Sequence, residues 1–77
     1  MFTYEKKFEV NSHEVIDVVR LLGRFGLRFE ISDEYSKVDD LDPNRKVRFR
    51  RFVIYGNRKE LTAFFEARKL IREYHLH

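Results

Sequence analysis

The first ten residues alternate between apolar and polar side chains, which is the pattern of a half-buried strand. Its apolar face carries Phe2, Tyr4, Phe8 and Val10. Lys6 interrupts this row, and we expect it near a sheet edge, where its aliphatic stem can carry the charge to water.

Helical spacing follows this strand. Asn11 and Glu14 are three residues apart, as in a capping box that opens a helix. Apolar residues then recur every three or four positions, which predicts an amphipathic helix. They are Val15, Ile16, Val18, Val19, Leu22 and Phe25. Gly23 and Gly26 are the candidates to end it.

Alternation returns at residues 27–35 and predicts a second strand. Its inward side chains are Leu27, Phe29, Ile31 and Tyr35. Residues 36–45 contain three Asp, the only Pro and an Asn, which are typical of turns. We therefore expect a long acidic loop between the second strand and the next one.

This loop begins like a calcium-binding loop, with Asp40, Asp42 and Asn44 at alternate positions. Arg45 stands where such a loop needs glycine, and Arg51 stands where it needs a bidentate glutamate. Two arginines would repel the cation, so we expect a turn without a metal. The acidic side chains could instead recognise a basic protein partner.

A third strand is predicted at residues 46–55, but its apolar side chains change phase. Val47 and Phe49 share one parity, whereas Phe52 and Ile54 share the other. A β-bulge at the intervening pair of arginines would turn all four toward the core, because one extra residue shifts the phase. The outer face would then carry Arg48, Arg50 or Arg51, Val53 and Tyr55. Without a bulge, one arginine lies inward or the strand is covered on both faces.

A second helix is predicted after Gly56, with Asn57 and Glu60 as its capping box. It runs to about residue 74. Its apolar face contains Leu61, Phe64, Phe65, Ala67, Ile71 and Tyr74. Arg68 falls within this face and either lies along the core with its charged end at the rim or points toward a dimer partner.

The elements follow the order β-α-β-β-α, which predicts an α+β sandwich. We expect a three-stranded, mostly antiparallel sheet with both helices on one face. The expected strand order is second, third, first, so that the first and second strands are the sheet edges. Residues 1–77 are expected to form a single domain whose core draws on eight Phe and four Tyr.

Composition narrows the environment and the chemistry. The chain has no Cys, an N-terminus without the apolar run of a signal peptide, and no stretch near the ~20 apolar residues of a membrane helix. We expect a cytoplasmic protein without a membrane contact. His13 is expected to face solvent, and the His75 and His77 pair has too few ligands for a metal site. We expect no enzymatic activity and no cofactor.

Charge is distributed unevenly along the chain. Residues 1–44 hold six Lys and Arg against ten Asp and Glu, a net charge of −4, whereas residues 45–77 hold ten against three, a net charge of +7. The basic residues concentrate in the third strand and at the start of the second helix. Such an asymmetry favours an acidic partner, above all nucleic acid.

The order of the elements resembles an RNA-recognition-motif domain, whose third strand carries basic and aromatic residues that stack bases. Residues 48–55 match that motif at Arg48, Phe52, Val53 and Tyr55. They depart from it at Phe49, Arg50 and Arg51, and we expect no fourth strand after the second helix. The family is therefore not assigned.

Our leading hypothesis is a small non-enzymatic module that binds nucleic acid, RNA more than DNA. The expected binding residues are Arg45, Lys46, Arg48, Arg50, Arg51, Arg58 and Lys59 for phosphates and Tyr55 for stacking. An alternative structural role for the arginines is pairing with carboxylates of the neighbouring strands. The candidate carboxylates are Glu5, Glu9, Glu30 and Glu34.

The rival function is a protein-binding regulator or inhibitor, of the compact kind that phages and mobile elements encode. It would act through a charged sheet face or an exposed edge strand. A third interpretation is a homodimer built on the sheet or on the last helix.

Overall fold

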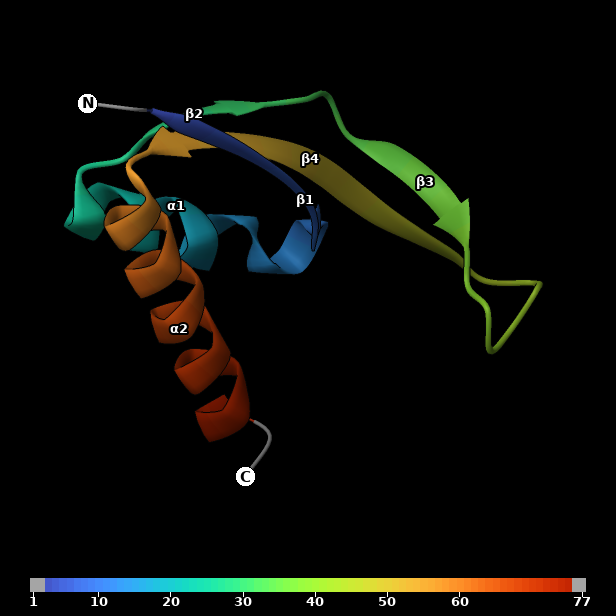
Figure 1. Ribbon diagram of the computed structural model, residues 1–77. Helices are drawn as coiled ribbons and strands as arrows, with labels where there is room; N and C mark the ends of the chain where they lie inside the picture. Colours follow the sequence, from blue (N-terminus) through green and yellow to red (C-terminus); the bar gives the residue numbers. More distant parts are fainter. Residues whose placement is uncertain (1–2, 76–77) are drawn as a thin grey trace.

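A computed structural model describes the backbone of residues 3–75 and the side chains of residues 3–72, and it places two helices on one face of an antiparallel sheet (Figure 1). The elements are β1 (Tyr4–Asn11), the 3-10 helix η1 (Ser12–Glu14), α1 (Val15–Phe25), β2 (Arg28–Ile31), β3 (Tyr35–Val38), β4 (Lys46–Gly56) and α2 (Arg58–His75). The α+β class and the placement of both helices are as predicted. The predictions for Phe2 and for the side chains of Tyr74, His75 and His77 lie outside the described part of the chain.

β4 is the centre of the sheet. β1 pairs with it in antiparallel register from Tyr4 opposite Gly56 to Asn11 opposite Phe49. β2 and β3 pair in succession with its other side. The expected strand order is therefore confirmed, since the strand predicted third lies between the first and the second.

The strand count is a correction. The single strand predicted at residues 27–35 is interrupted, and its second part, β3, continues to Val38. The loop consequently begins at Asp39 instead of residue 36. The sheet has four strands in the described part of the chain, and the element order is β-α-β-β-β-α.

Of the alternatives for β4, the bulge is excluded, because β1 pairs with β4 in one unbroken register. The extra residue lies on the other side of β4. Ile31 is opposite Phe52 and Tyr35 is opposite Phe49, so that residues 32–34 face only two residues of β4. The change of phase between the apolar residues of β4 is thus matched by an extra residue between β2 and β3.

The unbroken register turns the two halves of β4 to different sides. Phe52 and Ile54 are fully buried beneath the sheet, against the helices. Val47 and Phe49 have the opposite parity and lie on the side that none of the described helices covers, so they do not enter the core as the bulge alternative required. The alternative with one arginine directed inward is the one observed, because Arg50 is half-buried on the helix side.

The core lies between the sheet and the two helices. Its buried residues are Val10, Val18, Leu21, Leu22, Leu27, Phe52, Ile54, Leu61 and Phe64. Phe8 stacks on Phe52 with ring centroids 5.5 Å apart and meets Phe65 edge-on at 5.3 Å. Ile16, predicted on the apolar face of α1, is instead 65% exposed. Aromatic packing of this kind stabilises a small domain beyond its area burial.

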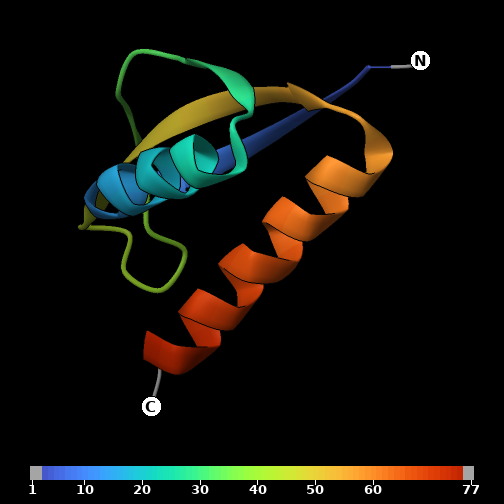
Figure 2. The ribbon, with the colours of Figure 1, turned by 90° about the vertical axis from the view of Figure 1, so that its left-hand side faces the viewer.

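α2 packs against the sheet mainly through its first half. Figure 2 shows it descending away from the strands toward the C-terminus. Leu61 and Phe64 in its first half are buried, whereas Leu70 and Ile71 in its second half are exposed. The exposure of Ile71 corrects its predicted place in the apolar face.

The two predicted capping boxes have different outcomes. At α2, the Asn57 backbone N–H donates to the Glu60 carboxylate at 3.0 Å and the Glu60 N–H donates to the Asn57 side-chain oxygen at 2.8 Å, which confirms the prediction. Asn11 makes no capping hydrogen bond, because it continues β1 opposite Phe49. Gly26 ends α1 in the left-handed region, with φ of 66°.

Candidate nucleic-acid interface

The eight predicted binding residues are divided between the two faces of the sheet. Successive side chains of a strand point to opposite sides. Lys46, Arg48 and Arg50 therefore share the helix side of β4, whereas Arg51 and Tyr55 lie on the opposite side. Arg50 and Arg51, although neighbours in the sequence, thus lie on opposite faces of the sheet.

The remaining predicted residues lie at opposite ends of β4. Arg45 precedes the strand, and Arg58 and Lys59 begin α2 just after it. At a rise of about 3.3 Å per residue, the ten steps from Lys46 to Gly56 span about 33 Å. The eight residues therefore do not form one compact patch, and a ligand must extend along the strand to contact both ends.

The first end of β4 belongs to a projecting hairpin. We call residues 35–49, which comprise β3, the loop 39–45 and the start of β4, the β-arm. β1 stops opposite Phe49, so that Lys46, Val47 and Arg48 pair only with β3 among the described strands. Figure 1 shows this hairpin extending beyond the helices. Its cations are consequently open to solvent.

The acidic loop at the tip of the β-arm is a turn, as predicted. The Asp39 carboxylate accepts the Leu41 backbone N–H at 3.0 Å, and the Asp42 carboxylate accepts the Asn44 N–H at 3.0 Å. These bonds are typical of Asx turns. Leu41 is 95% exposed between the aspartates.

One of the predicted arginines has a carboxylate partner. An Nη atom of Arg48 lies 3.5 Å from a Glu34 oxygen, and 72% of the Arg48 side chain is exposed. The other predicted cations have no carboxylate within 4 Å among the side chains that the structure describes. Among the described side chains, pairing with a carboxylate of the same molecule is therefore observed for Arg48 and for no other predicted cation.

The side of the sheet opposite the helices, which we call the outer face, carries side chains from all four strands. Its members are Glu5, Lys7, Glu9, Arg28, Glu30, Tyr35, Lys37, Val47, Phe49, Arg51, Val53 and Tyr55. Three are aromatic and four are cationic. Tyr35 was expected inward, but the extra residue before it reverses its side.

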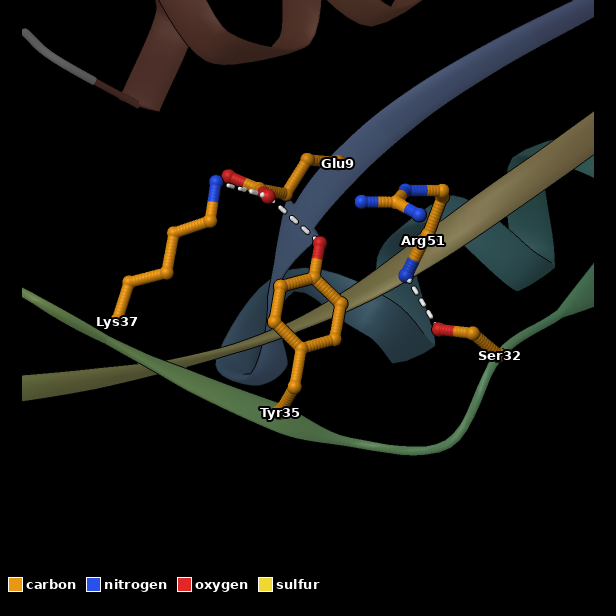
Figure 3. A network of polar contacts seen from close by, with 5 residues as sticks. All are labelled: Glu9, Ser32, Tyr35, Lys37 and Arg51. Carbon is orange, nitrogen blue, oxygen red and sulfur yellow. Dashed lines mark hydrogen bonds and ion pairs between the residues drawn. The ribbon is translucent and has the colours of Figure 1, made fainter.

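A polar network occupies the centre of the outer face (Figure 3). The Tyr35 hydroxyl donates to the Glu9 carboxylate at 2.6 Å, and Lys37 Nζ lies 2.6 Å from the same carboxylate oxygen. The Arg51 guanidinium lies over the Tyr35 ring, 5.6 Å from its centroid. The network links β1, β3 and β4 across the full width of the sheet.

This network changes the acidity of its members. The hydrogen bond from Lys37, followed by that from Tyr35, stabilises the charged carboxylate and lowers the pKa of Glu9. Each partner is affected by its own bond to Glu9, which raises the pKa of Tyr35 and the pKa of Lys37. Glu9 therefore stays ionised and occupied, and Arg51 is left without a close carboxylate in the described structure.

The stacking candidate lies at the other end of the outer face. Tyr55 is half-buried, and the Arg28 guanidinium lies 5.4 Å from its ring centroid. Partial burial, and then the negative charges of Glu30 and Glu5, raise the pKa of its hydroxyl. The ring is thus held in place by a cation on one side.

Sequence reasoning missed the contribution of Tyr35, Phe49 and Lys37 to this surface. Tyr35 was expected to point inward, Phe49 would have entered the core only with a bulge, and Lys37 was assigned to the loop. The available signal was the run of three polar residues at 32–34, which breaks the alternation before Tyr35. A break of that kind is typical of an interrupted strand.

A concavity lies between the helices. It has a volume of about 350 Å³ and is lined by His13, Glu14, Asp17, Val18, Leu21, Arg68, Ile71 and Arg72. An Nη atom of Arg68 lies 4.0 Å from Glu14, and its guanidinium lies 5.2 Å from the Phe8 ring centroid. Burial is the main cause that lowers the pKa of Arg68. This arginine lies along the core with its charged end at the rim, which is the first of its two predicted placements.

No protein-family model matches the chain, and no curated protein or solved structure has a significant match to it. Neither helix, within the residues described, has the length and apolar character needed to cross a membrane. Among the described side chains, no three of the His, Asp and Glu residues gather closely enough to hold a metal ion.

Proposed function

We propose that the protein is a small non-enzymatic module that binds nucleic acid, RNA more than DNA, through the basic strand β4. The observation that supports this most directly is the availability of its cations. Arg45, Lys46, Arg50 and Arg51 have no described carboxylate within 4 Å. Unpaired cations along one strand can neutralise successive phosphates.

The ion pair of Arg48 does not remove this residue from the proposal. Exposed ion pairs stabilise a fold by about 0–1 kcal/mol, because water screens them. A phosphate that approaches Arg48 can therefore replace Glu34 as its partner at small cost.

The experiment is a salt titration of binding to generic RNA and DNA. Affinity should fall linearly with salt on a double-logarithmic scale, with a slope set by the number of phosphates contacted. The double reversal Arg50→Glu with Arg51→Glu should abolish binding. Absence of binding at low salt, or micromolar binding that ignores the reversal, would exclude the proposal.

A matched control is the double reversal Arg20→Glu with Arg24→Glu. Both residues lie on α1, away from strand β4, and the change in net charge is the same. If strand β4 is the contact, this control should keep most of the affinity. Equal losses in the two variants would indicate only a long-range effect of net charge.

A protein-binding regulator or inhibitor is the second candidate, and two observations favour it. β1 pairs only with β4 among the described strands, so its other edge offers eight residues for strand addition. Leu41, at the tip of the β-arm, is exposed beside three aspartates. Co-purification from the native cell, with Leu41→Ser and a Pro substitution of Lys6 in parallel, would identify which of these surfaces holds a partner.

A further inference from the structure

We infer that the outer face is the surface that binds nucleic acid, and that its ligand is single-stranded, with bases stacked on Tyr35, Phe49 and Tyr55. The inference rests on the proposed function and specifies its ligand and its contact surface. Three half-buried aromatic rings on a sheet face without a helix over it are the observation that carries it.

The first stacking position lies on the β-arm. The rings of Tyr35 and Phe49 are neighbours, with centroids 6.3 Å apart and planes inclined by 32°. Lys37 Nζ lies 6.0 Å from the first centroid and 5.7 Å from the second. The two rings form an apolar platform on which a base can stack. Lys37 is already bound to Glu9 at 2.6 Å, so the phosphate contact falls to the neighbouring Arg51.

The second stacking position is Tyr55. It is six residues from Phe49 on the same side of β4, or roughly 20 Å at the rise of a strand. Arg28 lies against its ring at 5.4 Å. Between the two positions lie Arg51 and Val53. A ligand that reaches both positions must therefore be a strand of several nucleotides.

The charge of the outer face favours a phosphate chain at its centre. Glu9 is occupied by Lys37 and Tyr35, and Glu5 lies 3.5 Å from Lys7. Glu30, opposite Val53, is the third carboxylate of this face and has no cation within 4 Å among the described side chains, so that four cations stand against three carboxylates. Arg51 has no such partner among the described carboxylates. It stands between the two aromatic positions, where a bound strand passes from one to the other.

A duplex does not fit this arrangement. Its bases are stacked on one another, so that their faces are not accessible to aromatic side chains. A single strand can turn its bases onto a protein surface, and stacking is sequence-tolerant because every base has a π-face. The outer face should therefore bind single strands with little sequence preference.

The neighbouring arginines provide a matched pair for the test. Arg51→Gln removes a charge from the outer face, and Arg50→Gln removes the same charge from the helix side. Binding of a fluorescent single-stranded RNA of about twelve nucleotides is compared with that of the same sequence as a duplex. Two stacking variants, Tyr55→Leu and Phe49→Leu, keep an apolar side chain in place of the ring, and Tyr55→Phe is their control. Thermal melts show whether each variant is folded.

The single strand should bind at least tenfold more tightly than the duplex. Loss of an aromatic ring should weaken binding roughly 5- to 150-fold, which corresponds to about 1–3 kcal/mol per stacked base. Tyr55→Phe should be near native, and Arg51→Gln should weaken binding more than Arg50→Gln.

Preference for the duplex, equal effects of the two arginine variants, or unchanged affinity without the rings would overturn the inference. In these cases the proposed function would stand if the double charge reversal still abolished binding. Absence of binding to any of the RNAs would overturn the inference and the proposed function together.

Discussion

Ser32 and Arg51 are joined by two hydrogen bonds at the place where the sheet loses its regular pairing. The Ser32 backbone N–H donates to the Arg51 carbonyl at 2.9 Å, and the Arg51 backbone N–H donates to Ser32 Oγ at 2.8 Å. A side-chain oxygen thus replaces the carbonyl that a regular strand would supply. This substitution lets β2 and β3 follow one another along β4 despite the extra residue.

Replacement of this hydroxyl should weaken the junction. Ser32→Ala leaves the Arg51 N–H without its acceptor, and because the site is exposed, water replaces part of the bond. We expect a loss of about 0.5–1.5 kcal/mol in the free energy of unfolding, measured by chemical denaturation. Ser36→Ala, at an exposed position of β3, is the control and should change little. Equal losses in the two variants would contradict the account of the junction.

The sequence was sufficient to predict the helices, the first and last strands and the order of the strands. The alternation around Phe8 and the helical spacing around Leu22 depend on which side chains must be buried, and burial is inferred directly from periodicity. The capping box of Asn57 was predicted from its spacing to Glu60, which is a local signal. Asn11 had the same signal, but the chain continued as a strand there because pairing with β4 outweighs a local cap.

The faces of the sheet could not be predicted as well. Periodicity relates a side chain to its neighbours in one strand, but it does not reveal which of two paired strands takes an extra residue. A bulge in β4 and an interruption at residues 32–34 both reconcile the two phases. The choice decides whether Phe49 and Tyr35 enter the core or the outer face, and with it the composition of the candidate site.

The polar network should make the free energy of unfolding decrease as the pH falls into the acidic range. The pKa of Glu9 is lower in the folded protein than its ordinary value of 4.5, so its contribution is complete above that pH and is lost as the pH falls through the folded pKa. In an NMR titration, Lys37→Met should raise the pKa of Glu9 more than Tyr35→Phe does, because the bond from Lys37 is the larger cause. Titration of native Glu9 at its ordinary pKa would contradict the network.

Two glycines of the first helical segment should respond in opposite directions to alanine. A methyl group added at Gly23, within α1, would meet no neighbouring atom within 4 Å, so Gly23→Ala should stabilise the protein by about 0.5–1 kcal/mol. Gly26 has φ of 66°, so Gly26→Ala should destabilise it by about 1–2 kcal/mol. Thermal melts of the two variants provide the comparison. A stabilising effect of Gly26→Ala would show that Gly26 does not end the helix as described.

Cations at the far end of β4 should matter only for long ligands. Arg58 and Lys59 follow the end of β4 at Gly56, which is about 33 Å along the strand from Lys46 and beyond the reach of a short strand bound at the β-arm. For an RNA of about twelve nucleotides, Arg58→Gln with Lys59→Gln should lower the salt slope by about 1.4, or 0.7 for each lost contact. For an RNA of about four nucleotides bound at the β-arm, the slope should not change. An equal change for both lengths would indicate that the end of β4 is part of a single compact site.

The most direct measurement is an NMR titration of side-chain signals with single-stranded RNA. Val47 and Val53 lie on the outer face, and Ile54 lies on the helix side of the same strand. The account predicts that the methyl signals of both valines and the guanidinium signal of Arg51 shift on binding, while those of Ile54 and Arg50 stay in place. Shifts confined to Arg50, Ile54 and the helices, or no shift anywhere, would contradict it.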